Sequence, residues 1–242
     1  MKHRVYYCPS PFENLEIKTE DFENHKGYSY TFCPVWNHRF NRTLICFSPC
    51  DFSMSISNNI FKYQIDDGEV IQVNINDLDD DYYDDYVHFS LDDIKRDEPV
   101  VQLVFTSIHV WTDYQDEYTW FEMLDHPLTS VKNNFYAIGG WWNIANHARS
   151  TSLAVRMCDS NKTLNFKKGD PIYRIRFYTQ DMNDEISFLK KSSSKVNLEE
   201  QKELMQDRME LFENDRNLMN RVLFEKDTRK KCPYHYNNFE NV

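Results

Sequence analysis

Residues 42–75 read RTLICFSPCDFSMSISNNIFKYQIDDGEVIQVNI, and this stretch decides the fold class. It contains short runs of β-branched and aromatic residues, most of which alternate apolar with polar positions, and turn residues separate the runs. Asp67-Gly68 lies between the last two runs, where an Asp-Gly pair is a strong β-hairpin signal. The stretch therefore predicts consecutive strands at 42–47, 52–57, 60–65 and 69–75.

Similar runs continue on both sides of this stretch. The apolar run VVQLVFTSIHVW at 100–111 predicts a central strand that is covered on both faces. No helical period occurs among the strands that could supply crossover helices, which argues against a βαβ fold. Further strands are predicted at 4–8, 28–35, 117–124, 133–144, 151–157 and 171–179. We therefore expect a mainly β protein, with a β-sandwich or jelly-roll-like domain over residues 1–185.

An acidic stretch at residues 76–98 interrupts the strands. It is rich in aspartate, and so many like charges predict a solvated loop rather than a packed strand. The glycine that an EF-hand needs at its sixth position is missing, so a calcium loop is not expected.

The last part of the chain, residues 186–242, has a helical pattern. Asn197 and Glu200 form a capping-box-like start, and neither Gly nor Pro occurs within residues 192–227. The apolar residues of 197–226 fall on one wide stripe of a helix about 45 Å long at 1.5 Å per residue, which exceeds the width of a small β-domain. We expect this long amphipathic helix to contact a protein partner or a second copy of the chain. The stripe consists of Leu198, Leu204, Met205, Met209, Leu211, Phe212, Leu218, Met219, Val222 and Leu223.

Composition excludes several functional classes. The net charge of −11 disfavours binding to nucleic acid, and the five glycines form no phosphate-binding loop motif. No apolar run of signal-peptide or membrane-spanning length occurs, so we expect a protein that is neither secreted nor in a membrane. In a reducing compartment the six cysteines are not expected to form disulfides, and Cys33, Cys46, Cys50 and Cys158 are interpreted as small buried apolar residues.

Two Cys-Pro segments carry a histidine at a spacing that suits metal ligands. They are CPVWNH, with Cys33 and His38, and CPYH, with Cys232 and His235. Two thiolates and two imidazoles would satisfy a tetrahedral zinc ion. Zinc is therefore the first cofactor candidate, although the two halves lie far apart in the sequence.

Iron is the weaker cofactor candidate. Cupin-like iron oxygenases bind iron through two histidines and a carboxylate, and an H-x-D motif often contains two of these ligands. The chain has no H-x-D or H-x-E. His109 and Asp113 have the wrong spacing for neighbours on one strand face, but a strand bend could bring them together with His126 or His147. A metal-dependent oxygenase is thus the alternative function.

Aromatic residues supply the candidate binding surface. In YAIGGWWNI, residues 136–144, adjacent Trp141 and Trp142 must point to opposite faces of an extended strand. One tryptophan could then line a groove for protein or carbohydrate, while Gly139 and Gly140 allow a close backbone approach. The binding candidates are Trp36, Trp141, Trp142, His109 and Asp113.

The order of these segments resembles a family of uncharacterised phage and bacterial β-proteins. The resemblance covers YTFCPVWNHRFNRTLICFSPCDF, the apolar segment VQLVFTSIHVWTDYQDEYTW, and WWNI followed by LNFKKGDPIYRIRFY, within residues 4–180. It implies a source like the T4-like phages of marine bacteria, a compact β-domain, and a location in the host cytoplasm or the virion. No activity is assigned to that family, so we expect a non-enzymatic virion component or assembly module.

Overall fold

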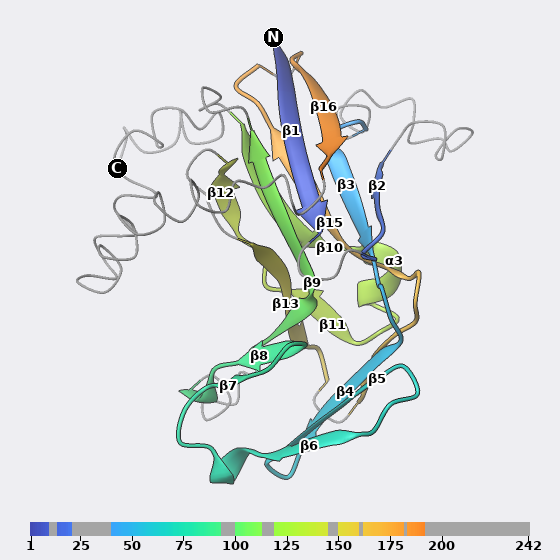
Figure 1. Ribbon diagram of the computed structural model, residues 1–242, viewed down its shortest axis with the longest axis vertical. Coiled ribbons are helices and arrows are strands. Elements are labelled where there is room, and N and C mark those ends of the chain that lie inside the picture. Colours follow the sequence, from blue (N-terminus) through green and yellow to red (C-terminus); the bar gives the residue numbers. More distant parts are fainter. Residues whose placement is uncertain are drawn as a thin grey trace, which may run out of the picture.

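The computed structural model describes residues 1–9, 14–20, 40–92, 100–112, 119–144, 150–159, 162–181 and 183–191. In these ranges the protein is mainly β, with three sheets and little helix (Figure 1). The strand predicted at 28–35 and the helix predicted at 197–226 lie outside the described residues.

The largest sheet, sheet A, has seven strands around the long strand β9 (Val100–Thr112). Its main path runs in the order β11-β13-β9-β1-β16, and β8 also pairs with β9. Among the described strands of sheet A, only β1 and β16 are parallel, with Lys2 opposite Glu185, and β16 extends the sheet to Lys190. The other strands of sheet A are β1 (Lys2–Pro9), β7 (Tyr82–Tyr83), β8 (Val87–Phe89), β11 (Phe135–Ala137), β13 (Thr151–Met157) and β16 (Glu185–Lys190).

Two smaller sheets are entirely antiparallel. Sheet B has the order β12-β10-β15-β3-β2, and sheet C has the order β14-β4-β5-β6. The strands of sheet B are β2 (Ile17–Thr19), β3 (Thr43–Phe47), β10 (Trp120–Asp125), β12 (Trp141–Asn143) and β15 (Pro171–Tyr178). Sheet C consists of β4 (Phe52–Ser57), β5 (Ile60–Ile65), β6 (Ile71–Asn74) and β14 (Leu164–Phe166), and the helical turns are η3 (Ile75–Asp77) and α3 (Pro127–Ser130).

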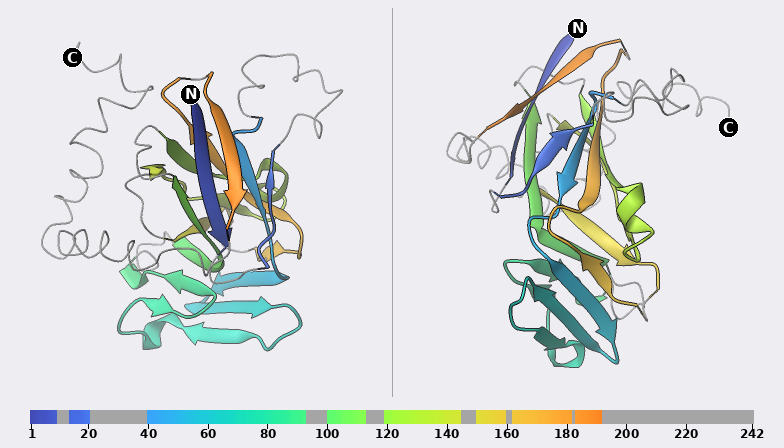
Figure 2. Two further views of the ribbon diagram at one scale, coloured as in Figure 1. Left: turned by 45° about the horizontal axis from the view of Figure 1, so that its top comes forward. Right: turned by 90° about the vertical axis from the view of Figure 1, so that its right-hand side faces the viewer.

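Sheet A packs against both smaller sheets, with sheet B near the N-terminal end of β1 and sheet C at the opposite end (Figures 1 and 2). The Tyr173 hydroxyl of β15 donates to the Thr106 carbonyl of β9 at 2.7 Å, which ties sheet B to sheet A. The Phe52 ring of β4 lies 4.9 Å from the Phe105 ring, which ties sheet C to the same strand. The predicted central position of the 100–111 strand is confirmed, since β9 lies between β13 and β1; its second face is half-buried rather than fully covered.

The hairpin predicted at Asp67-Gly68 is confirmed as the connection from β5 to β6. The Gly68 amide donates to the Ile65 carbonyl at 3.0 Å, and a Cβ at Gly68 would come within 2.9 Å of that oxygen. Asp66 in the same turn has a φ of 48°, a conformation that aspartate and asparagine tolerate better than most residues.

The acidic stretch is more ordered than a solvated loop, because it forms β7 and β8. Asp84 accepts hydrogen bonds from the Tyr63 and Tyr82 hydroxyls and, at 2.8 Å each, from the amides of Tyr86 and Val87. The Asp84 carboxylate thus satisfies the two amides of the turn that leads into β8. This turn allows Val87 and Phe89 of β8 to bury their apolar side chains. The other acids of the stretch that the structure describes, up to Asp92, are exposed, so solvation explains them but not the whole segment.

Candidate functional site

Most of the predicted metal ligands lie outside the described residues, and the zinc and iron sites therefore stay predictions. The residues in question are Cys33, His38, Cys232 and His235 for zinc, Asp113 and His147 for iron, and Trp36 among the binding candidates. Within the described ranges, no three His, Cys, Asp or Glu side chains come together in a way that could hold a metal ion.

His109 is half-buried on β9, directly opposite Cys8 of β1. It alternates with the buried Ile108 and Val110, so its ring projects from the face of sheet A that is turned away from sheet B. Burial lowers the pKa of His109, which favours the neutral ring at pH 7. His126 follows β10 in sheet B, so the structure does not place these two histidines on one face.

Cys46 and Cys50 are buried members of the core, in line with the packing interpretation. Burial raises the pKa of each thiol to about 12, so both are protonated and poorly nucleophilic at neutral pH. The same interpretation is wrong for Cys158, which is exposed. Cys158 follows Met157, the last residue of β13, and its amide donates to the Asn134 carbonyl at 3.0 Å. At this point the chain leaves the covered part of the sheet.

The prediction that Trp141 and Trp142 point to opposite faces is confirmed. Trp142 packs against the core, with its ring 5.2 Å from that of Phe121. Trp141 lies on the outer face of sheet B, with its ring 5.5 Å from that of Trp120 and 5.8 Å from that of Tyr178. Alternation along β12 therefore divides the pair into a core residue and a surface residue.

Gly139 and Gly140 make this placement possible where the chain passes from β11 in sheet A to β12 in sheet B. A Cβ at Gly139 would lie 2.2 Å from the Met123 carbonyl oxygen, and one at Gly140 would lie 2.2 Å from the Trp142 ring. Both contacts are far shorter than a real Cβ contact allows. The predicted close backbone approach is thus present, and it seats Trp142 against the core.

The outer side of sheet B carries a compact aromatic and charged surface, which we call the aromatic face. The Tyr178 hydroxyl donates to Glu122 Oε2 at 2.6 Å, and burial, followed by this bond, raises the pKa of Tyr178 to about 12. The indole N–H of Trp120 and the Nε–H of Arg176 are both buried donors without a hydrogen-bond acceptor in the described part of the chain. The aromatic face consists of Trp120, Glu122, Trp141, Arg176 and Tyr178.

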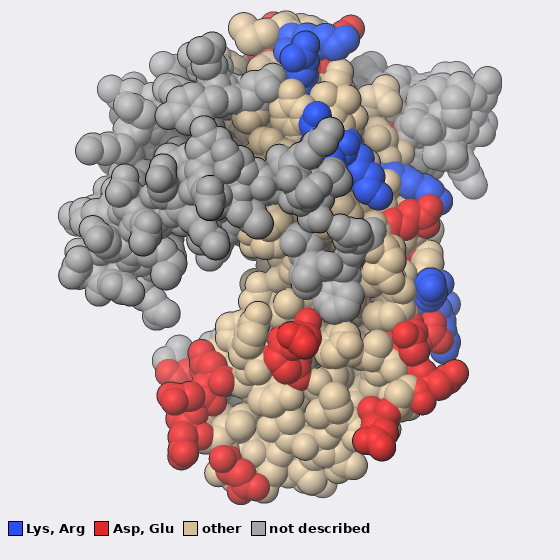
Figure 3. Space-filling view, in the orientation of Figure 1, with Lys and Arg blue, Asp and Glu red and all other residues tan. Residues whose placement is uncertain are grey.

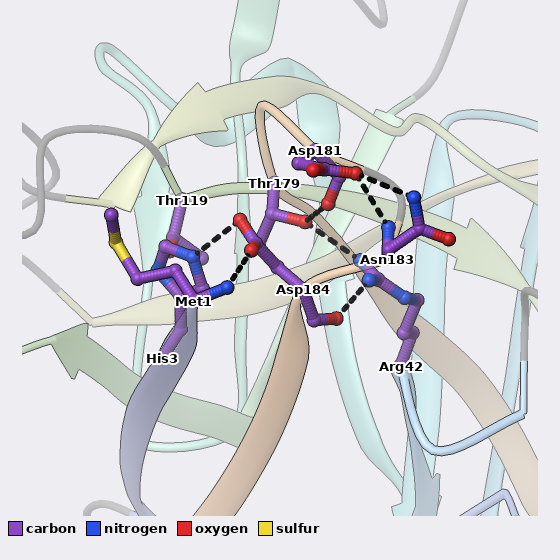
Figure 4. Close-up of polar contacts among 8 residues, drawn as sticks. All are labelled: Met1, His3, Arg42, Thr119, Thr179, Asp181, Asn183 and Asp184. Atoms are coloured by element: carbon purple, nitrogen blue, oxygen red, sulfur yellow. Dashed lines mark hydrogen bonds and ion pairs between the residues drawn. The ribbon is translucent and has the colours of Figure 1, made fainter.

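A second cluster of functional groups closes the core near the N-terminal end of β1 (Figure 4). His3 Nε2 lies 3.0 Å from Asp184 Oδ2, and His3 Nδ1 lies 3.2 Å from the Thr119 hydroxyl. The α-amino group of Met1 donates to the other oxygen of Asp184. Burial tends to raise the pKa of Asp184, but the bonds from the amino group and from His3 outweigh it and lower that pKa below the ordinary value.

Arg42 completes this polar cluster from sheet B. Its Nη1 donates to the Thr179 hydroxyl at 2.9 Å, and its Nη2 donates to the Asp184 backbone carbonyl. Thr179 in turn donates to the Asp181 carbonyl at 2.7 Å. The polar cluster, which consists of Met1, His3, Arg42, Thr119, Thr179, Asp181, Asn183 and Asp184, therefore joins segments of both layers (Figure 4).

The hydrogen bonds connect Thr119 to His3 and His3 to Asp184, as in a catalytic triad. Thr119 would take the place of the nucleophile, His3 that of the base and Asp184 that of the acid that orients the base. However, Thr119 and His3 are only 0% and 3% exposed, so a substrate could not reach the hydroxyl in this arrangement. The hydrogen bonds of the cluster satisfy buried polar groups at the margin of the core.

Sequence reasoning missed this polar cluster and most of the aromatic face. The bonded atoms of the cluster belong to separate segments, and His3 and Asp184 are 181 positions apart in the sequence. No local sequence motif can therefore predict their contact. One signal was present in the sequence. His3 lies two residues before Val5 and four before Tyr7, so all three side chains share one face of the strand, and the apolar pair marks it as the core side.

A scan against models of protein families and a search of curated proteins find no match to this chain. Among the described residues, no helix is both long and apolar enough to span a membrane.

Proposed function

We propose that this protein is a non-enzymatic, phage-type interaction module that acts as a virion component or in assembly. In this proposal a β-sandwich or jelly-roll-like domain presents the aromatic face, and the C-terminal helix predicted at 197–226 supplies a second contact. The layout that resembles phage β-proteins, from 4 to 180, supports the viral assignment.

The observation that carries the proposal is the position of Trp141. It is half-buried on the outer side of sheet B, beside the rings of Trp120 and Tyr178, although its neighbour Trp142 serves the core. Tryptophan, tyrosine and arginine are enriched where proteins bind one another, because each combines a large contact area with a polar group. Glu122 and the Tyr178 hydroxyl, which are half-buried on the same face, add polar groups directly beside these rings.

The aromatic face is tested by the association of the full-length chain. We expect purified protein to form an oligomer or to hold a protein partner, and Trp141→Ser to weaken that association at least about tenfold, as for the loss of an interface hot spot. Tyr136→Ser is the matched control, because Tyr136 is an exposed aromatic residue on a strand of sheet A. A monomer without any partner, or equal effects of the two variants, would contradict this role.

The helix is tested separately with two charges on its predicted stripe. Leu204→Glu combined with Leu211→Glu should abolish association, while Gln206→Glu combined with Asn217→Glu, off the stripe, should leave it intact. Light scattering of both variants over a range of concentrations measures the outcome. Unchanged association in the first variant would exclude the helix from the interface.

A further inference from the structure

The charge of this protein is concentrated in one region, which we call the acidic lobe. The lobe comprises residues 51–92, from β4 to the end of the β8 segment, and contains eleven Asp and Glu residues against one Lys. Its net charge is −10, compared with −11 for all 242 residues, so the rest of the chain is close to neutral. Figure 3 shows acidic side chains on both sides of this lower part of the molecule, with uncharged surface between them.

The acidic lobe ends in an open strand edge. β6 is the terminal strand of sheet C and pairs with β5 alone among the described strands. The Ile75 amide donates to the Asn59 carbonyl at 2.8 Å, and bonds recur at every second residue of an antiparallel ladder. Val73 and Ile71 therefore bond to β5, whereas the backbone N–H and C=O groups of Val70 and Gln72 point away from the sheet.

Apolar side chains are exposed along this edge. Val70 is 50% exposed and Ile71 is 39% exposed. Ile71 and Val73 lie opposite Tyr63 and Phe61, which are core residues, so an added strand could place apolar side chains beside them. On the other face, Gln72 lies opposite Lys62 and leaves room for polar side chains.

We propose that β6 binds an extended, basic segment of a partner protein by strand addition. Open edges recruit strands through their unpaired backbone groups, and alternating side chains give specificity. Acids stand at both ends of β6, with Asp66, Asp67 and Glu69 before it and Asp77, Asp79 and Asp80 after it. They attract a cationic strand, and they repel a second copy of the same acidic edge, so the charge selects a partner over self-pairing.

This surface is distinct from the aromatic face, which belongs to the outer side of sheet B, and neither proposal depends on the other. The probe is a fluorescein-labelled peptide of four Lys-Val repeats, acetylated and amidated, whose fluorescence anisotropy is measured with the full-length chain. A Glu-Val peptide tests the charge, and a Lys-Val peptide N-methylated at alternate residues tests the backbone pairing. We expect the Lys-Val peptide alone to bind, with an affinity that falls as salt rises.

Variants of the chain locate the site. Gln72→Pro removes an outward N–H without removing a bond to β5, and it should weaken binding at least about tenfold because one partner carbonyl loses its donor. Asp67→Asn combined with Glu69→Gln should weaken binding about fivefold, as expected for two rim charges. The matched control, Glu16→Gln combined with Glu185→Gln, removes two exposed acids far from β6 and should have no effect.

Several results would overturn the proposal. These are failure of the Lys-Val peptide to bind, equal binding of the Glu-Val or N-methylated peptide, and unchanged affinity in Gln72→Pro. Self-association of the chain that Gln72→Pro abolishes would show that a second copy, and not a basic partner, occupies the edge. Amide hydrogen exchange of residues 70–74 with and without peptide decides the site even if one variant is poorly stable.

Discussion

The two ends of this molecule use charged side chains in opposite ways. In the polar cluster, Arg42, His3 and the amino group of Met1 surround Asp184, and these groups lie at the margin of the core. In the acidic lobe, nearly all the acids are exposed and only Lys62 carries a positive charge. The difference teaches that charge at the first end holds the layers together, whereas most acids at the second end face solvent. The exceptions are Asp51, which pairs with Lys167 at 2.7 Å, and Asp84.

The largest predicted effect comes from breaking the polar cluster. Arg42→Met leaves the Thr179 hydroxyl and the Asp184 carbonyl without their buried donor, and it should lower the free energy of unfolding by about 3 kcal/mol. Urea denaturation measures this loss. Lys132→Met, at an exposed position, should cost less than about 0.5 kcal/mol. Equal midpoints for the two variants would mean that the polar cluster does not stabilise the fold.

The next effect concerns Asp84, which is the exception within the acidic lobe. It accepts bonds from Tyr63, Tyr82 and two amides, so Asp84→Asn should lower the free energy of unfolding by about 2 kcal/mol. Asp85→Asn is the neighbouring control at an exposed position and should change it little. If Asp85→Asn proved as costly as Asp84→Asn, the lobe would depend on its overall charge rather than on one carboxylate.

The cost of Asp84→Asn should also depend on pH. Burial tends to raise the pKa of Asp84, but its four hydrogen bonds outweigh burial and lower that pKa below 3.8. A carboxyl with a lowered folded-state pKa stabilises the protein fully above its unfolded value and loses that contribution as pH falls through the folded value. Urea titrations should therefore show the difference between wild type and Asp84→Asn shrinking below about pH 4. A difference that persists to pH 2 would contradict the charged hydrogen-bond network.

The smallest predicted effect on stability is that of the exposed acids beside β6. Asp67→Asn combined with Glu69→Gln should change the free energy of unfolding by less than about 0.5 kcal/mol, because both side chains are exposed. The same variant should nevertheless weaken binding of the basic peptide. A clear loss of stability in urea would place these acids with the structural charges and remove the contrast between the two ends.

The local parts of this fold could be predicted from the sequence. The strands within 42–75 and the Asp67-Gly68 hairpin follow from alternation and turn chemistry, and so does the division between Trp141 and Trp142. Strands of two or three residues, such as β7 and β14, are too short to show a detectable alternation. Tertiary contacts, and not a local pattern, stabilise them. The parallel pairing of β1 with β16 joins residues near positions 2 and 185, a separation that leaves no local signal.

The candidate sites were harder to predict for the same physical reason. Trp141 could be singled out by its neighbour and by the two preceding glycines, but its companions Trp120 and Tyr178 come from other strands. Arg42 has no sequence signal that sets it apart from a surface residue, and the alternation of β1 indicates only that His3 lies on the core side, not what it contacts. The open edge of β6 depends on which strands pair, so its exposure was not visible in the alternating pattern that predicts the strand itself.

The contrast between the two ends is tested most directly by amide hydrogen exchange of the full-length chain with and without the Lys-Val peptide. The account predicts that the peptide slows exchange at Val70 and Gln72 in β6, and leaves exchange at His3 and Asp184 in the polar cluster unchanged. Protection at the polar cluster, or none at β6, would contradict it.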